Sequence, residues 1–212
     1  MMHVTSGRIL TRRAVLLGTA ALSVSGCAFL SKPQVPQLYI LRPEVAAPMG
    51  MPVHWRLSVA VPDAVSSLDT PRIALSRSPI TMDYFAGAAW TDRVPLLLQR
   101  TLVQSFDTSG RIVSVDRDTN GFGSDYLLET EIRDFQARYD SPSGPPEVVV
   151  VIQVKLVRMP EREIVGGMLA SQRATAVSNS MDSVVSAFNQ AAGAALSQIV
   201  GWTLNQSGPM PA

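Results

Sequence analysis

The sequence has 212 residues, of which 46% are hydrophobic, and its 18 basic and 17 acidic side chains give a formal net charge of +1. Residues 1–27 hold three arginines and no acid, so the remaining chain has 15 basic and 17 acidic residues and a charge of −2. This near-neutral balance argues against nucleic-acid binding, which needs a basic excess. The single cysteine, Cys27, excludes an intramolecular disulfide, and about 185 further residues suffice for one domain with its own core.

The N-terminus has the layout of a secretory signal peptide. Basic residues precede an uncharged apolar run, residues 14–25, which is shorter than the roughly 20 residues of a spanning helix and ends in small side chains. Residues 1–26 are therefore predicted to be a removed lipoprotein signal peptide. Residues 11–17, TRRAVLL, also resemble the twin-arginine export motif. The general secretory and twin-arginine routes both stay open, and both lead out of the cytoplasm.

Residues 24–27, VSGC, resemble the lipobox of bacterial lipoproteins. The resemblance implies that Cys27 receives a diacylglycerol, that the chain is cut before it, and that its amine is acylated, with palmitate as the expected fatty acid. The alternative is a free or buried cysteine that happens to follow a signal peptide. Several acyl chains anchor a protein stably, since each buried methylene contributes about 0.8 kcal/mol. Ala28 at the next position, in place of Asp, favours the outer membrane, with the domain facing the periplasm.

Residues 27–37 form the predicted lipidated N-terminus and tether, which spans roughly 35 Å when extended. The folded domain is expected over residues 38–208, followed by a tail at 209–212. Its first strand is predicted at 38–41. Residues 54–61 alternate as a half-buried strand with an apolar face of Trp55, Leu57, Val59 and Val61. Two short strands are predicted around a turn at Ser76 to Pro79.

The first helix is predicted to begin with Thr91 as its cap and Pro95 in its first turn, and to stop at Gly110. Its buried face is formed by Val94, Leu98, Leu102 and Phe106. A strand follows at 112–115. Residues 126–139 change the phase of their apolar alternation, which predicts a β-bulge near Arg133 or Asp134.

Residues 148–158 give the strongest strand pattern, with Val148, Val150, Ile152, Val154 and Leu156 on one face. Residues 164–177 return as a third strand, which completes an antiparallel meander. A long amphipathic helix is predicted from about Ser180, with an apolar stripe of Met181, Val185, Phe188, Ala192, Ala195, Ile199 and Trp202. The expected fold is a single α+β domain with a mostly antiparallel sheet packed by two main helices.

Motifs for catalysis, metals or cofactors do not occur in the sequence. His54 lies on the polar face of its strand, where a surface side chain is favoured over a general base. Glu129 and Glu131 share one strand face and could imitate a catalytic pair, although solvated charge is the simpler interpretation. Residues 121–125, GFGSD, lack the helix that a phosphate loop needs. We therefore expect no enzyme, no cofactor and no metal site.

A distinctive set of residues runs through the first half of the predicted domain: Tyr39, Ile40 and Leu41; Val61 and Pro62; Leu68, Asp69, Pro71, Arg72 and Ile73; and Tyr84, Phe85 and Trp90. Through these residues, and most clearly over residues 59–106, the chain resembles the ABC-type transport auxiliary lipoproteins, the lipoprotein partners of mammalian-cell-entry (MCE) type lipid transporters and of the paraquat-inducible intermembrane transport system. The chain departs from the family pattern after Trp90, where Thr91, Asp92 and Arg93 replace the usual acidic residue, proline and leucine.

The resemblance implies a non-catalytic, lipid-anchored subunit of an MCE or ABC-type lipid transport system. It would dock the periplasmic transporter component at the inner leaflet of the outer membrane. Its expected partners are an MCE-type or paraquat-inducible-type periplasmic subunit, the membrane, and further copies of itself in a homo-oligomer. Two alternatives are an envelope-assembly lipoprotein and a carrier of a small hydrophobic ligand.

Overall fold

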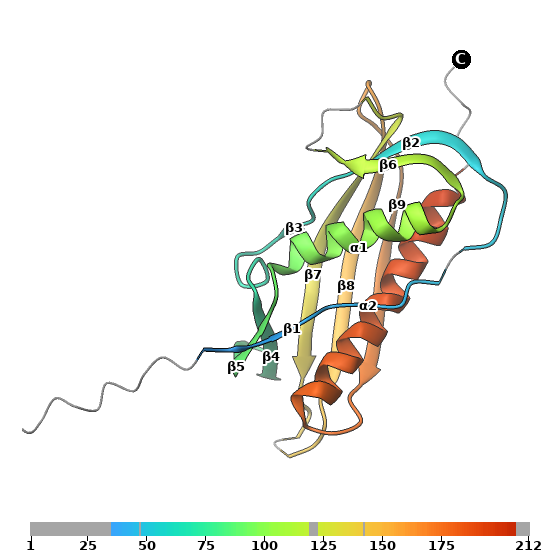
Figure 1. Cartoon of the computed structure of the whole chain (residues 1–212). Coiled ribbons are helices and arrows are strands. Elements are labelled where there is room, and N and C mark those ends of the chain that lie inside the picture. Colours follow the sequence, from blue (N-terminus) through green and yellow to red (C-terminus); the bar gives the residue numbers. More distant parts are fainter. Residues whose placement is uncertain (1–34, 47, 119–122, 142, 207–212) are drawn as a thin grey trace, which may run out of the picture. The chain divides into compact units, whose positions relative to one another are not determined.

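Nine strands and two helices make up the part of the chain that the computed structural model describes, which is residues 35–46, 48–118, 123–141 and 143–206 (Figure 1). In chain order they are β1 (Gln37–Tyr39), β2 (Val53–Val59), β3 (Asp63–Ala64), β4 (Arg72–Ser78), β5 (Thr81–Trp90), α1 (Val94–Thr108), β6 (Ile112–Arg117), β7 (Tyr126–Arg138), β8 (Glu147–Arg158), β9 (Glu163–Thr175) and α2 (Met181–Leu204). The predicted signal peptide, Cys27, the tail at 209–212 and residues 121 and 122 of the 121–125 loop lie outside the described residues.

Strand β7 is central because both of its edges are paired. One edge pairs antiparallel with β8, which pairs antiparallel with β9, so the predicted meander is confirmed. The other edge pairs in parallel with β2, β3 and β4 in succession along its length. Strand β6 adds beside β2, while β5 and then β1 add beside β4. The sheet is mixed, its longest pairings are antiparallel, and with the two helices it forms the predicted α+β domain.

The even positions of β8 line the core as the alternation predicts. Val148, Val150, Ile152, Val154 and Leu156 are each at most 1% exposed. The predicted bulge is also present, because the β7–β8 register shifts between Ile132 and Asp134. The extra residue at Arg133 moves the apolar set from even to odd positions, so both halves of β7 face the same core.

Both helices pack on one face of the sheet (Figure 1). Helix α1 lies against β2 and β6, and α2 lies against β8 and β9. Between them and the sheet, the Phe188 ring of α2 lies 5.2 Å from the ring of Trp90 and 5.1 Å from that of Phe135. All three rings are at most 1% exposed, so this cluster joins β5, β7 and α2 in one core. No helix among the described residues has the length and apolar character needed to cross a membrane.

The end of β2 differs from the prediction. The strand stops at Val59, and Val61 is 39% exposed, whereas the alternation placed it in the core. Pro62 has no N–H to continue the ladder and restricts the residue before it, so the chain leaves β7 and returns as β3. Val61 is therefore not a core residue.

The start of α1 also differs. Thr91 does not cap the helix: its N–H donates to the Tyr39 carbonyl beside β1, and the N-cap is Arg93, two residues later. The four predicted buried residues of α1 are confirmed. The β4–β5 turn lies at Pro79 and Ile80, slightly later than predicted, and β5 runs on to Trp90 because β1 pairs with its last residues. The last helix starts as predicted, with Ser180 as its N-cap.

Candidate functional site

The side chains considered for catalysis lie apart or in ion pairs. His54 is exposed on β2. Arg162 lies 3.4 Å from Glu129, and Arg133 lies 3.6 Å from Glu131, so both carboxylates have cationic partners. The two glutamates line a hollow of about 320 Å³ on the sheet surface. Within the described ranges, no three His, Cys, Asp or Glu side chains gather as a metal site.

Asp125, the last residue of the predicted glycine-rich loop, has a structural contact. Its carboxylate accepts a 2.7 Å hydrogen bond from the Arg56 backbone N–H and lies 3.4 Å from the Arg56 guanidinium. Burial alone would raise the pKa of Asp125, but the hydrogen bonds and charge of Arg56 outweigh it and lower that pKa. The residue therefore joins β2 to the start of β7.

The sheet face opposite the helices is covered by charged side chains. Arg138 donates to the Asp134 carboxylate, and Arg173 lies 2.6 Å from Glu147. Burial raises the pKa of Asp134, although Arg138 and other polar neighbours oppose this. Val149 lies on this face and is only 1% exposed. Its register partners are Gln136 of β7 and Arg173 of β9, and a long side chain such as that of Arg173 covers apolar surface with its aliphatic stem while its charged end stays in water.

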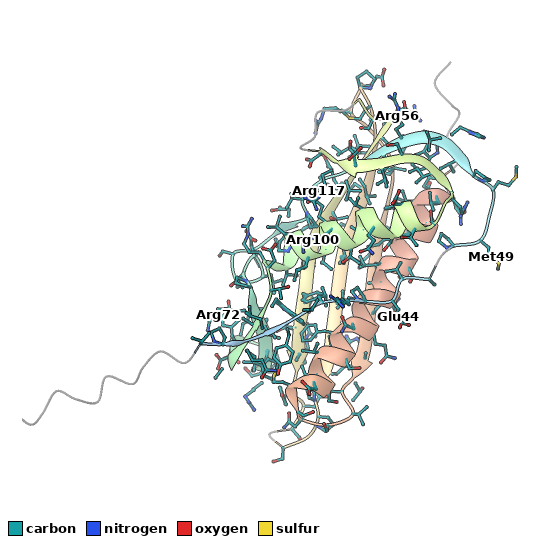
Figure 2. All side chains as sticks on the ribbon, in the orientation of Figure 1. Glu44, Met49, Arg56, Arg72, Arg100 and Arg117 are labelled. Carbon is teal, nitrogen blue, oxygen red and sulfur yellow. The ribbon has the colours of Figure 1, made fainter. Side chains whose placement is uncertain are left out.

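Two methionines point into solvent from the connection between β1 and β2. Met49 is 95% exposed and Met51 is 84% exposed. Figure 2 shows Met49 on the outer side of this connection. We call residues 48–52, PMGMP, the methionine loop.

The methionine loop is held by a buried arginine. Arg111 is 8% exposed, and its guanidinium donates to the carbonyls of Met49 and Met51 at 3.0 to 3.1 Å. It also reaches Asn205 Oδ1 at the end of α2, 3.5 Å away. Gly50 has a φ of +143°, and a Cβ there would lie 2.6 Å from Arg111 Nη2. The backbone is thus fixed from inside while both methionine side chains are left outside.

Val113 is a third exposed apolar side chain at this end of the sheet, where its neighbour Ile112 pairs with Val53. It follows Arg111 by two residues, lies on β6 and is 64% exposed. We call Met49, Met51 and Val113 the methionine end. Methionine is flexible and polarisable, and it is over-represented on surfaces that bind other proteins. A fixed backbone with adaptable apolar side chains is suited to docking a protein surface.

The other end of the sheet exposes apolar side chains from two separate connections. Ile80 of the β4–β5 turn is 93% exposed, and Val177, between β9 and α2, is 95% exposed. Tyr139 links the two connections. The guanidinium of Arg77 on β4 lies 4.8 Å from the Tyr139 ring centroid, and the Tyr139 hydroxyl donates a 2.8 Å hydrogen bond to Asn179. We call Ile80 and Val177, with the turn residue Pro79 and the neighbouring Met82, the hairpin end.

Neither end was predicted from the sequence. The methionine loop has no periodicity, and its only signal is a pair of prolines and one glycine around two methionines. The one predicted site residue, Cys27, lies outside the described residues and remains a prediction. Among the described residues, strand β9 pairs only with β8.

Residues 39–200 match the sequence profile of the family described as "ABC-type transport auxiliary lipoprotein component". The chain is similar to a protein of unknown function from Bradyrhizobium diazoefficiens, at 28% identity over 174 residues. That alignment covers 78% of this chain and 44% of the relative, so the chain spans less than half of the relative's length.

Two solved structures are also similar. A crystal structure of a Xanthomonas campestris protein has a TM-score of 0.73 and 28% identity, covering 79% of this chain and 95% of that one. A crystal structure of an uncharacterised protein has a TM-score of 0.63 and 16% identity, covering 80% and 99%. The second likeness concerns the fold alone.

Proposed function

Because the chain belongs to the ABC-type transport auxiliary lipoprotein family, we propose that it is a non-catalytic, lipid-anchored subunit that docks the periplasmic component of an MCE-type or paraquat-inducible-type lipid transporter at the outer membrane. Its task is binding. The acyl chains on Cys27 hold it in the inner leaflet, and the folded domain faces the periplasm.

The methionine end is the proposed docking surface for the transporter subunit. The observation that carries this assignment is the buried Arg111, which hydrogen-bonds the backbone of a loop whose two methionines point outward. Burying a guanidinium is unfavourable unless its donors are satisfied. A partner would cover the three apolar side chains without having to order the loop first, which lowers the entropic cost of binding.

The experiment is copurification. The full chain is captured from detergent-solubilised membranes, and the proteins bound to it are identified by mass spectrometry. We expect an MCE-type or paraquat-inducible-type subunit, with recovery at least tenfold lower for the Met49→Asp, Met51→Asp double variant. The matched control is Val65→Asp, at a side chain 63% exposed and away from this end. Repeated absence of such a subunit, or equal recovery with the double variant, would contradict the proposal.

The anchor is tested separately. Cys27→Ser removes the thiol that would be acylated and leaves residues 36–212 unchanged, so we expect acylation to be lost, the domain to stay folded, and the protein to leave the acylated membrane fraction. A Cys27→Ser chain that still fractionates with membranes as an acylated species would show that the anchor lies elsewhere.

A further inference from the structure

The hairpin end combines two nearly fully exposed apolar side chains on one supported platform. Strand pairing brings them to the same end of the sheet: Ser76 of β4 is paired with Arg138 of β7, Arg138 with Glu147 of β8, and Glu147 with Thr175 of β9. The β4–β5 turn follows Ser76 within a few residues, and the β9–α2 connection begins directly after Thr175. Tyr139 joins them through Arg77 and Asn179. A two-residue hairpin turn has no need of an isoleucine for folding, so Ile80 is available for contact with something outside the chain.

The N-terminal segment enters the sheet from the same end. Strand β1 runs parallel to β5, with Gln37 beside Ala88 and Tyr39 beside Trp90. Since β5 begins at the hairpin turn, the Gln37 end of β1 is the end directed toward that turn. Between Arg72, which pairs with Ala89, and Ser78 at the turn, β4 takes six strand steps, or roughly 20 Å.

The length of the tether decides which end can meet the membrane. Ten residue steps separate Cys27 from Gln37, which is at most roughly 35 Å of extended chain. The hairpin turn, about 20 Å from β1 along the strands, is within this reach. The methionine end lies in the opposite direction from β1. Counted from the level of Arg72 through the β4–β7 and β7–β2 registers, the start of β2 is about twelve strand steps away, or about 40 Å. An anchored domain can therefore rest its hairpin end on the membrane with a slack tether, whereas the methionine end lies at the limit of the fully extended tether.

We infer that the hairpin end lies on the lipid surface that holds the anchor, with Ile80 and Val177 inserted among the lipid headgroups and upper acyl chains. This inference rests on the proposed function, because it takes Cys27 as the anchored residue. Exposed β-branched side chains gain free energy when they leave water for this interfacial region. The exposed charges nearby, Arg77, Asp83 and Asp140, include both signs, so the contact does not depend on anionic lipid.

Such a contact has a consequence for docking. A flexible tether alone leaves the domain free to tilt. Two apolar contacts at one end also fix the orientation of the domain, so that the methionine end points away from the membrane and toward a periplasmic partner. The other occupants to be distinguished are a second copy of the chain and a partner protein.

Site-specific photo-crosslinking tests the inference in the full chain in cell envelopes. A benzophenone amino acid replaces Ile80, Val177 or, at the far end, Val113, and the intact protein is analysed by mass spectrometry, which also reports acylation of Cys27. We expect phospholipid adducts at positions 80 and 177 in at least tenfold higher yield than at 113. Equal yields at the three positions, or protein adducts in place of lipid at position 80, overturn the inference.

A second arm separates lipid contact from mere proximity. With the probe at Met82, which is 40% exposed, we compare the native background with Ile80→Asp, Val177→Asp. Both substitutions are at exposed positions, so the fold should be kept. Lipid adducts at 82 should fall at least fivefold, and Val65→Asp should leave them unchanged; an unchanged yield in the double variant overturns the inference. Acylation is read in the same samples and copurification is measured in its own experiment, so failure of the anchor or of docking is seen separately from failure of the lipid contact.

Discussion

The methionine end and the hairpin end both expose apolar side chains, but they are held in different ways. At the methionine end a single buried cation, Arg111, satisfies loop carbonyls that strand pairing does not reach. At the hairpin end the turn is set by β4–β5 pairing, and the neutral side chain of Tyr139 adds a hydrogen bond to Asn179 and ring contacts with Arg77 and Phe85. Removing a buried charged donor leaves more unsatisfied groups than removing a neutral one. The methionine end should therefore be the more easily disrupted.

The largest expected effect comes from a substitution in the core that both ends share. Phe188→Ala should lower the free energy of unfolding by about 3–5 kcal/mol, because it leaves a cavity between Trp90, Phe135 and α2. Urea unfolding measures the loss, and hydrogen exchange should increase at both ends together. Val65→Ala is the exposed control. If only one end loses protection, the two ends belong to separate cooperative units.

Arg111→Met should act on one end. The substitution keeps the aliphatic stem but removes the donors to Met49, Met51 and Asn205, so stability should fall by about 2–3 kcal/mol. Hydrogen exchange should rise in residues 48–53 and stay unchanged at the hairpin turn. Arg100→Met, which removes an exposed ion pair with Asp92, should cost at most about 0.5 kcal/mol. Equal losses for the two variants would mean that Arg111 does not organise the loop.

Tyr139→Phe is the matching change at the hairpin end. It removes the hydrogen bond to Asn179 but keeps the ring under Arg77, so we expect a loss of about 1 kcal/mol. Faster exchange should be confined to the β9–α2 connection. Tyr84→Phe removes a comparable bond to Ser67 and should leave that connection unaffected. A loss as large as that of Arg111→Met would remove the contrast between the two ends.

The smallest effect depends on pH. Arg56 lowers the pKa of Asp125 in the folded state, so this carboxylate stabilises the fold above its unfolded pKa, and the contribution is lost as the pH falls through the folded pKa. Asp125→Asn should cost about 0.5 kcal/mol at neutral pH and nothing in strong acid. Asp134 changes stability with pH in the opposite direction. Its pKa is raised in the folded state, so as the pH falls Asp134 is protonated in the folded chain before it is protonated in the unfolded chain. Unfolding curves at several pH values measure both, and a pH-independent loss for Asp125→Asn would refute the ionic contribution.

The core of the fold could be predicted because it depends on local periodicity. The alternation along residues 148–158 gives the buried face of β8, and the phase change within 126–139 gives the bulge. Polar positions that owe their burial to distant partners were not predictable. Arg111 resembles an ordinary charged residue before a strand, and only the approach of a loop some 60 residues earlier turns it into a buried donor.

The predicted start of α1 and the predicted end of β2 were wrong for the same reason, because both depend on parts of the fold outside the local pattern. Thr91 has the side chain of a good N-cap, but the backbone pairing with β1, far back in the chain, extends to Thr91, and the helix has its N-cap two residues later. Val61 continues the apolar alternation of 54–61, yet the adjacent proline ends the ladder before it. The exposure of Met49, Ile80 and Val177 is likewise a property of the folded chain, since nothing in the local sequence separates them from core residues.

The most direct test of the account is the affinity of the purified transporter subunit for the lipidated full chain in vesicles. We compare the native chain with Met49→Asp, Met51→Asp and with Ile80→Asp, Val177→Asp, using vesicles with the protein facing outward. The account predicts binding that weakens at least tenfold for the methionine variant, with a much smaller change for the hairpin variant. Equal affinity for the native chain and the methionine variant would contradict docking at the methionine end.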